Sequence, residues 1–155
     1  FPNDTDEDGY GWAFEEVGHE LIHPFPPDVV VTQLGVDKFY DDPLTNLQLS
    51  ILGYERVLKR IKDLAPRWVA LGGGGYNISN VARAWTLAWS VMNGIELEED
   101  LPESFVKEAE RMGVEERVLR GNPRTPPHSM NEESRVEIER VVGYVKKTVF
   151  PKVKR

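Results

Sequence analysis

Two short apolar runs, each leading into a loop and then a helical segment, limit the possible folds of this sequence more than any other feature. The first run is DVVVTQLG, residues 28–35, and the second is RWVALGGGG, residues 67–75. Short, nearly unbroken runs of β-branched and apolar residues are typical of buried strands in parallel sheets. Residues 45–64 and 77–94 then carry apolar side chains at helical spacing. This order predicts an α/β fold in which helices cover a parallel sheet.

Further helices are predicted on both sides of this α/β unit. Apolar residues at helical spacing predict a helix over residues 9–23, which the prolines of HPFPPD end. A charged helix is expected at residues 103–119, and a last helix, which Asn131 can cap, at residues 132–149. The Pro-rich segment GNPRTPPHSMN joins these two helices. Gly94 is expected to end the second helix of the α/β unit.

Charge and composition exclude several classes of protein. The 155 residues carry a formal net charge of -7, and basic residues cluster only in the C-terminal KKTVFPKVKR. Because nucleic-acid-binding surfaces are normally basic, we expect no nucleic-acid partner. No apolar run approaches the roughly 20 residues that span a bilayer, so we expect no membrane partner. The chain has no cysteine, which excludes disulfide and thiol chemistry and fits a cytoplasmic protein.

The segment HELIH, residues 19–23, matches the H-E-x-x-H signature of zinc proteases. On a helix, His19 and His23 can hold one zinc ion, and Glu20 can activate the bound water. However, prolines end the predicted helix at His23, and the one other histidine, His128, lies in the Pro-rich segment. Because the signature fixes only three positions, a chance match is favoured, and a zinc protease is kept as an alternative.

Two loops that follow the predicted strands are stronger candidates for a site. In open parallel sheets, ligands bind where loops leave the carboxyl ends of the strands. Asp37 follows the first strand in LGVDKFYDDP, where its carboxylate can bind a metal or cap a turn. Asp42 precedes Pro43, and we expect it to form a turn and to hold the loop through backbone amides.

The second loop, LGGGGYN at residues 71–77, contains four consecutive glycines, more than a tight turn needs. Neither the P-loop pattern nor G-x-G-x-x-G is present. We therefore favour a glycine platform that presents the phenol of Tyr76 to a substrate carbonyl, where it can stabilise an oxyanion, over a packed turn. Trp85 and Trp89, four residues apart on the following helix, are expected in the core.

Together, TQLGVDKFYDDPLTNLQLS and WVALGGGGYNISNVARAWTLAWSVMNGIELEEDLP resemble the C-terminal half of the histone deacetylase superfamily, in particular its microbial acetoin-utilisation branch. The resemblance covers about residues 4–102 and implies the arginase/deacetylase α/β fold. Residues 1–102 are then the C-terminal portion of a deacetylase-like catalytic domain, and residues 103–155 are a helical C-terminal extension. The resemblance also implies zinc-dependent hydrolysis of an acetyl-lysine or a related acetylamide, with ferrous iron as an alternative metal.

The resemblance assigns roles to individual residues. Asp37 matches a zinc ligand, and Tyr76 matches the tyrosine that polarises the acetyl carbonyl and stabilises the oxyanion. Gly74 is similar to the glycine beside the acetyl group, and Leu44 to a residue at the mouth of the substrate tunnel. Val36 stands where the family more often has alanine. In such a site the metal and the phenol act on the same carbonyl oxygen.

The family's paired histidines and its Asp-x-His zinc ligands have no match in this chain, which begins with Phe1. One zinc ligand and one phenol do not form a competent hydrolytic site. The sequence therefore predicts the C-terminal fragment of a deacetylase, inactive alone, whose partner is the N-terminal remainder of the same protein. The predicted substrate is an acetylated lysine of a protein or a small acetylamide. A non-catalytic interaction domain is a further alternative.

Overall fold

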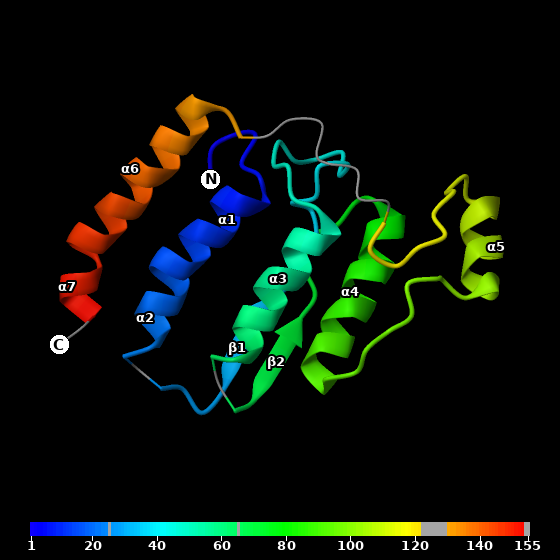
Figure 1. Ribbon diagram of the computed structural model, residues 1–155, viewed down its shortest axis with the longest axis horizontal. Helices are drawn as coiled ribbons and strands as arrows, with labels where there is room; N and C mark the ends of the chain where they lie inside the picture. Colours follow the sequence, from blue (N-terminus) through cyan, green and yellow to red (C-terminus); the bar gives the residue numbers. More distant parts are fainter. Residues whose placement is uncertain (25, 65, 122–129, 154–155) are drawn as a thin grey trace.

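The computed structural model describes residues 1–24, 26–64, 66–121 and 130–153, and Figure 1 shows how they are arranged. Within these ranges, no helix combines the length and the apolar character needed to cross a membrane. The elements in chain order are α1 (Glu7–Ala13), the π-helix η1 (Phe14–His19), α2 (Glu20–Ile22), β1 (Val30–Gln33), α3 (Ile51–Lys62), β2 (Trp68–Leu71), α4 (Ile78–Asn93), α5 (Glu103–Arg111), α6 (Glu132–Thr148) and α7 (Phe150–Val153).

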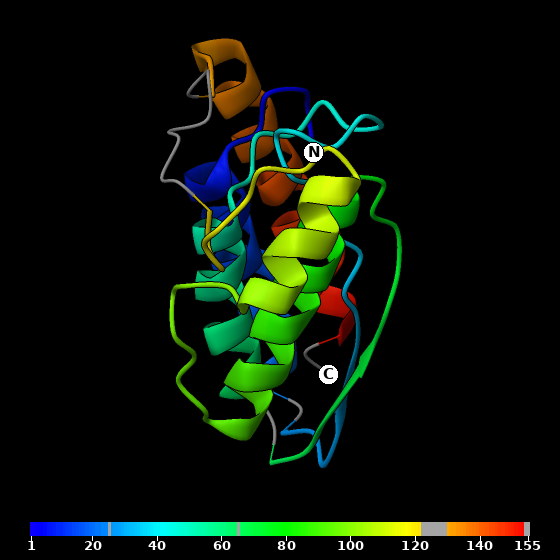
Figure 2. The same cartoon turned by 90° about the vertical axis from the view of Figure 1, so that its right-hand side faces the viewer.

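β1 and β2 form a parallel two-stranded sheet in which Val30 pairs with Trp68 and Gln33 with Leu71. The crossover between the two strands is α3, as the sequence predicts. The helices α6, α1, α3 and α4 lie side by side in one layer (Figure 1), and both strands lie on one side of that layer (Figure 2). The predicted α/β class, with parallel strands and covering helices, is confirmed.

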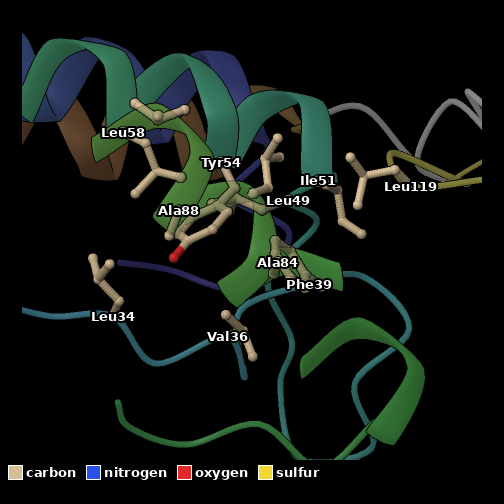
Figure 3. Close-up of a cluster of buried hydrophobic side chains, with 12 residues drawn as sticks. Leu34, Val36, Phe39, Leu49, Ile51, Tyr54, Leu58, Ala84, Ala88 and Leu119 are labelled. Carbon is tan, nitrogen blue, oxygen red and sulfur yellow. The ribbon is translucent and has the colours of Figure 1, made fainter. Parts of the chain in front are cut away.

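The main hydrophobic core lies between α3, α4 and the sheet (Figure 3). Tyr54 of α3 is 2% exposed, and its ring meets the ring of Phe39 edge-on with 5.6 Å between centroids. Phe39 and Leu49 belong to the loop between β1 and α3, and both are buried. Each such side chain contributes about 1.5–3 kcal/mol by burial. The core therefore also anchors the loop that contains Asp37.

Polar side chains fix the starts of three helices. Ser50, Asn77 and Asn131 each accept a hydrogen bond from a backbone amide in the first turn of α3, α4 and α6 respectively. The cap that the sequence predicts at Asn131 is confirmed, and so is the end of α4 at Gly94, which adopts a left-handed φ of 66°. Because Asn77 is also the residue after Tyr76, the start of α4 fixes the end of the glycine loop.

The helix predicted at residues 45–64 begins later than expected, at Ile51. The residues before it use their backbone groups elsewhere: Gln48 forms an isolated parallel bridge with Asp6, and Leu49 forms one with Phe39. Residues in such bridges cannot also supply helical hydrogen bonds, so tertiary pairing sets this boundary. By contrast, α1, η1 and α2 follow one another without a break, in agreement with the helix predicted at residues 9–23.

The helix predicted at residues 103–119 is also shorter than expected and ends at Arg111. Gly113 adopts a left-handed φ of 78°, which turns the chain out of the helix. Leu119 is instead buried against the main core. Most of the Pro-rich segment that follows, including His128, lies outside the described residues.

One face of the sheet is not covered by helices (Figure 2). Val31 is 62% exposed, Val69 46% and Leu71 54%, so the prediction of buried strands was wrong for these residues. Trp85 and Trp89 were also wrongly predicted as core residues, because they are 38% and 53% exposed, although Trp85 Nε1 donates a hydrogen bond to Leu34 O at 2.9 Å. An apolar run indicates a position that favours burial, but it does not indicate what covers it.

A buried ion pair joins α3 to the segment after α5. The Glu55 carboxylate accepts hydrogen bonds from Arg120 Nε at 2.9 Å and Nη2 at 3.2 Å, and its residue is 8% exposed. Hydrogen bonds from Arg120, and then from Lys59, hold the pKa of Glu55 below its ordinary value, although burial opposes this shift. A carboxyl group with a lowered pKa stabilises the fold above its unfolded-state pKa, and this stabilisation is lost as the pH falls through the folded-state pKa.

We therefore expect Glu55→Gln to lower the free energy of unfolding at neutral pH by about 1–3 kcal/mol, because the Arg120 guanidinium loses one of its two carboxylate acceptors and keeps only Glu99. The substitution should also reduce the loss of stability on acidification below about pH 4.5. Urea unfolding at several pH values measures both effects. Glu137→Gln removes a solvent-exposed pair with Arg140 on α6 and is the control, with little change expected. Equal effects from the two variants would contradict the prediction.

Candidate functional site

The loops that contain Asp37 and Tyr76 leave the same edge of the sheet, at the carboxyl ends of β1 and β2. Two hydrogen bonds continue the pairing of the strands into these loops: Leu34 N donates to Leu71 O at 2.8 Å, and Val36 N donates to Gly74 O at 2.6 Å. The sequence prediction that both loops lie at the carboxyl edge of a parallel sheet is therefore confirmed. This edge is where ligands of open α/β sheets bind.

The carboxylate of Asp37 lies directly against Gly74. A Cβ atom on Gly74 would lie 2.0 Å from Asp37 Oδ2 and 2.7 Å from Cγ, distances at which atoms overlap. Gly73 is equally restricted, because its Cβ would lie 2.1 Å from Gln33 Nε2. The glycine loop thus has no side chains at these positions because neighbouring polar side chains fill the space. Gly74 is predicted from the resemblance to lie beside the substrate, and it also makes room for Asp37.

Lys38, the residue after Asp37, connects this loop to the rest of the protein. Its ammonium group donates to Gly35 O at 2.8 Å and lies 5.0 Å from the centre of the Tyr54 ring and 5.7 Å from that of Tyr10. Burial lowers the pKa of Lys38 to about 8, and the negative charge of Asp37 acts in the opposite direction. The sequence reasoning did not identify Lys38, whose one signal was its place beside Asp37.

Asp42 connects the two loops, and its side chain is buried, with 5% of the residue exposed. Its Oδ2 accepts hydrogen bonds from Tyr76 N at 2.8 Å and Asn77 N at 3.3 Å, while Oδ1 accepts one from Leu44 N at 3.0 Å. The prediction that Asp42 holds the loop through backbone amides is confirmed. Nothing in the sequence indicated that two of those amides belong to the tyrosine loop.

Tyr76 and Leu44 are exposed at this edge of the sheet. Tyr76 is 56% exposed and Leu44 is 70% exposed, so a bound molecule can reach both side chains. Asp42 bonds to the backbone amide of each, and this shared acceptor brings the two predicted site residues together with the loop of Asp37. Of the predicted residues, Asp37, Leu44, Gly74 and Tyr76 therefore lie in connected loops.

The HELIH segment lies at the other end of the strands. Figure 1 shows α2 beside the start of β1, whereas both candidate loops follow the strand ends. The rings of His19 and His23 lie 5.9 Å apart between centroids, and Glu20 and His23 are exposed. Among the residues that the structure describes, no group of three or more His, Cys, Asp or Glu side chains is placed to hold a metal ion. HELIH therefore has no third metal ligand among the residues that the structure describes.

The absence of such a group of three ligands among the described residues also limits the metal chemistry at Asp37. A carboxylate oxygen is a suitable ligand for zinc or ferrous iron, and the space beside Gly74 keeps this carboxylate in one place. Among the described residues, Asp37 belongs to no group of three or more His, Cys, Asp or Glu side chains that could hold a metal ion. Asp37 can thus supply one metal ligand, but the described residues do not complete a ligand set around it.

Comparison with known proteins identifies relatives for most of the chain. The histone deacetylase domain model matches residues 1–92. The acetoin utilization protein AcuC of Bacillus subtilis is 36% identical over 108 residues, which cover 66% of this chain and 28% of that protein. Histone deacetylase clr6 of Schizosaccharomyces pombe is 34% identical over 97 residues, and histone deacetylase 19 of Arabidopsis thaliana is 36% identical over 98 residues.

The fold is similar to the crystal structure of an HDAC homolog complexed with SAHA, with a TM-score of 0.70 and 26% identity. The match covers 92% of this chain and 41% of that chain, so the structural similarity extends beyond the residues that the family model matches. The chain also spans only about a quarter of the length of AcuC and clr6, at 28% and 24% respectively. Most of each relative therefore has no counterpart here.

Proposed function

Because this chain belongs to the histone deacetylase family, we propose that it supplies one metal ligand, Asp37, and one catalytic phenol, Tyr76, to a metal-dependent deacetylase. The observation that carries the proposal is the junction of the two loops at the carboxyl edge of the sheet. There the Val36–Gly74 hydrogen bond and the Asp42 carboxylate hold the two loops together.

The chemistry requires more groups than this chain contributes. Asp37 would hold a zinc or ferrous ion, which supplies a Lewis acid that polarises an acetyl carbonyl and acidifies water. The role of Tyr76 is to donate its phenolic proton in a hydrogen bond to the carbonyl oxygen as negative charge develops on it. The remaining metal ligands and the general base are assigned to the N-terminal remainder of the protein, because no group of three or more metal-ligating side chains is present among the described residues and the family's paired histidines have no match in this sequence.

The uncovered sheet face supports this division of the site. Val31, Val69 and Leu71 form an apolar surface on β1 and β2, and this chain covers only 41% of the structural neighbour. Burial of this surface by the N-terminal remainder would be favourable at about 25 cal/mol per Å² of apolar area. The remainder is thus the proposed partner that covers the sheet and completes the site.

The proposed substrate is an acetylated lysine of a protein or a small acetylamide. Both present an uncharged acetamide on an aliphatic stem. Leu44, which is exposed and whose backbone amide shares the Asp42 carboxylate with that of Tyr76, offers an apolar contact for such a stem at the entrance of the site. Acetate release from an acetyl-lysine peptide and from a free small acetylamide, measured on the same preparation, compares the two classes.

Replacing Tyr76 with phenylalanine tests the catalytic part of this proposal. In the complete protein, Tyr76→Phe is expected to lower kcat by about 10²–10³-fold, because the loss of one oxyanion donor has this effect in related chemistry. Metal content should not change, since the phenol is not a ligand. Acetate release from an acetyl-lysine peptide measures kcat and KM.

Tyr144→Phe is the matched control, because it removes a phenol that is 64% exposed on α6 and belongs to no part of the site. Its activity should equal that of the parent protein. A Tyr76→Phe variant with unchanged kcat would show that this tyrosine does not stabilise the oxyanion.

A further inference from the structure

We propose that Asp42 is a positioning residue, which holds the backbone of Tyr76 where its phenol can reach the substrate carbonyl. This inference rests on the proposed function of Tyr76. The contact crosses 34 residues of sequence, from the loop after β1 to the loop after β2. It also reaches the amide of the proposed catalytic residue itself.

The bonding pattern explains why an aspartate is required. One carboxylate accepts three backbone N–H groups: Leu44 N on one oxygen, and Tyr76 N and Asn77 N on the other. Hydrogen bonds to a carboxylate are shorter and stronger than those to a neutral acceptor. An asparagine presents one oxygen and an NH₂ group, so at least one of these amides would face a donor instead of an acceptor.

Apart from Asp42, little holds Tyr76 in place on its solvent-exposed side. The Tyr76 side chain is exposed, so the direction of the phenol depends on the backbone beneath it. That backbone lies between Gly75 and the first turn of α4, which Asn77 caps. By holding the amides of Tyr76 and Asn77, Asp42 fixes this junction relative to Asp37. An error of about 1 Å in placing a catalytic group can reduce the rate by about 100-fold.

The neighbouring Asp41 provides a matched comparison. Its carboxylate accepts hydrogen bonds from the side-chain amides of Asn80 at 2.6 Å and Asn77 at 3.1 Å. It is exposed and has no bond to the amide of Tyr76 among those described. Asp41→Asn therefore makes the same chemical change one residue away, without removing the acceptor of the Tyr76 amide.

The test is a double-mutant cycle in the complete deacetylase, this chain together with its N-terminal remainder. We expect Asp42→Asn to lower kcat by about 10–100-fold, with little change in KM. In a Tyr76→Phe background, the same substitution should have little further effect, because a positioning residue acts only through the group that it positions. Asp41→Asn should leave kcat close to that of the parent.

Hydrogen exchange gives a readout that does not depend on activity. The amides of Tyr76 and Asn77 should exchange slowly in the parent protein and in Asp41→Asn, and faster in Asp42→Asn, while the core amides of α3 remain unchanged. If Asp42→Asn does not accumulate as folded protein, Asp42→Ser repeats both measurements with a smaller side chain that keeps one acceptor.

Equal losses of kcat in the parent background and in the Tyr76→Phe background would overturn the inference, because they would indicate a general structural role. Unchanged kcat and unchanged amide exchange in Asp42→Asn would overturn it as well. A parent protein without deacetylase activity would instead overturn the proposed function, and the catalytic role of Asp42 with it. If the parent protein is active but the double-mutant cycle shows no dependence of the Asp42→Asn effect on Tyr76, only the role of Asp42 is overturned, and the proposed function stays intact.

Discussion

Gly74→Ala is expected to lower both the metal affinity and the activity of the complete deacetylase by about 10–100-fold, because changes to the groups that orient a metal ligand typically have effects of this size. The alanine Cβ would lie 2.0 Å from Asp37 Oδ2, closer than real Cβ atoms approach their neighbours. The Gly74 backbone cannot easily retreat, because its carbonyl accepts a hydrogen bond from Val36 N at 2.6 Å. The Asp37 carboxylate must therefore move. Metal content after dialysis and acetate release measure the two effects.

Gly143→Ala is the control for this substitution. Gly143 lies within α6, and apart from its chain neighbours and the adjacent helix backbone, no atom of the described residues lies within 4 Å of the position of its added Cβ. We expect unchanged metal content and activity, and an increase in stability of about 0.5–1 kcal/mol, because alanine favours helix more than glycine. A Gly74→Ala protein that keeps its metal and its activity would contradict the role assigned to the space beside Asp37.

The position of the candidate site could be predicted because it depends on local pattern. The β-branched run before Asp37 and the apolar run before the four glycines indicate two strands, and the helix between them requires that the strands be parallel. Residues that follow such strands meet at one edge of the sheet. The placement of Asp37 and Tyr76 at one edge could therefore be predicted without any knowledge of tertiary contacts.

The connections between the two loops could not be predicted in the same way. The bond between the Asp42 carboxylate and the amide of Tyr76, and the contact between Asp37 and Gly74, join residues that are more than 30 positions apart. Turn chemistry suggested that Asp42 holds its own loop, and it does so through Leu44 N. No local rule specifies which distant amides the second oxygen accepts.

Burial was also misjudged where the sequence has no information about neighbours. Val31 and Trp89 are apolar and follow the patterns of core residues, yet both are exposed. The periodicity correctly assigned them to a strand and a helix. Whether a side chain in either element is covered depends on what packs against it, and in the proposed complete protein that is the N-terminal remainder.

The second large predicted effect is the loss of activity when this chain is separated from the N-terminal remainder, because the proposed site is divided between them. The 155-residue chain alone is expected to bind zinc weakly and to release no acetate above background. It offers Asp37 and Tyr76, while its described residues contain no group of three or more side chains that could hold a metal ion, and the family's paired histidines have no match in its sequence. Addition or co-expression of the N-terminal remainder should restore tight metal binding and activity together, because both depend on the same completed centre.

The most direct measurement is acetate release from an acetyl-lysine peptide by three samples: this chain, the N-terminal remainder, and the two combined. We predict turnover only in the combined sample, and its loss when the chain carries Tyr76→Phe. Robust turnover by this chain alone would contradict the proposal that the site is shared. So would activity in the combined sample that does not depend on Tyr76.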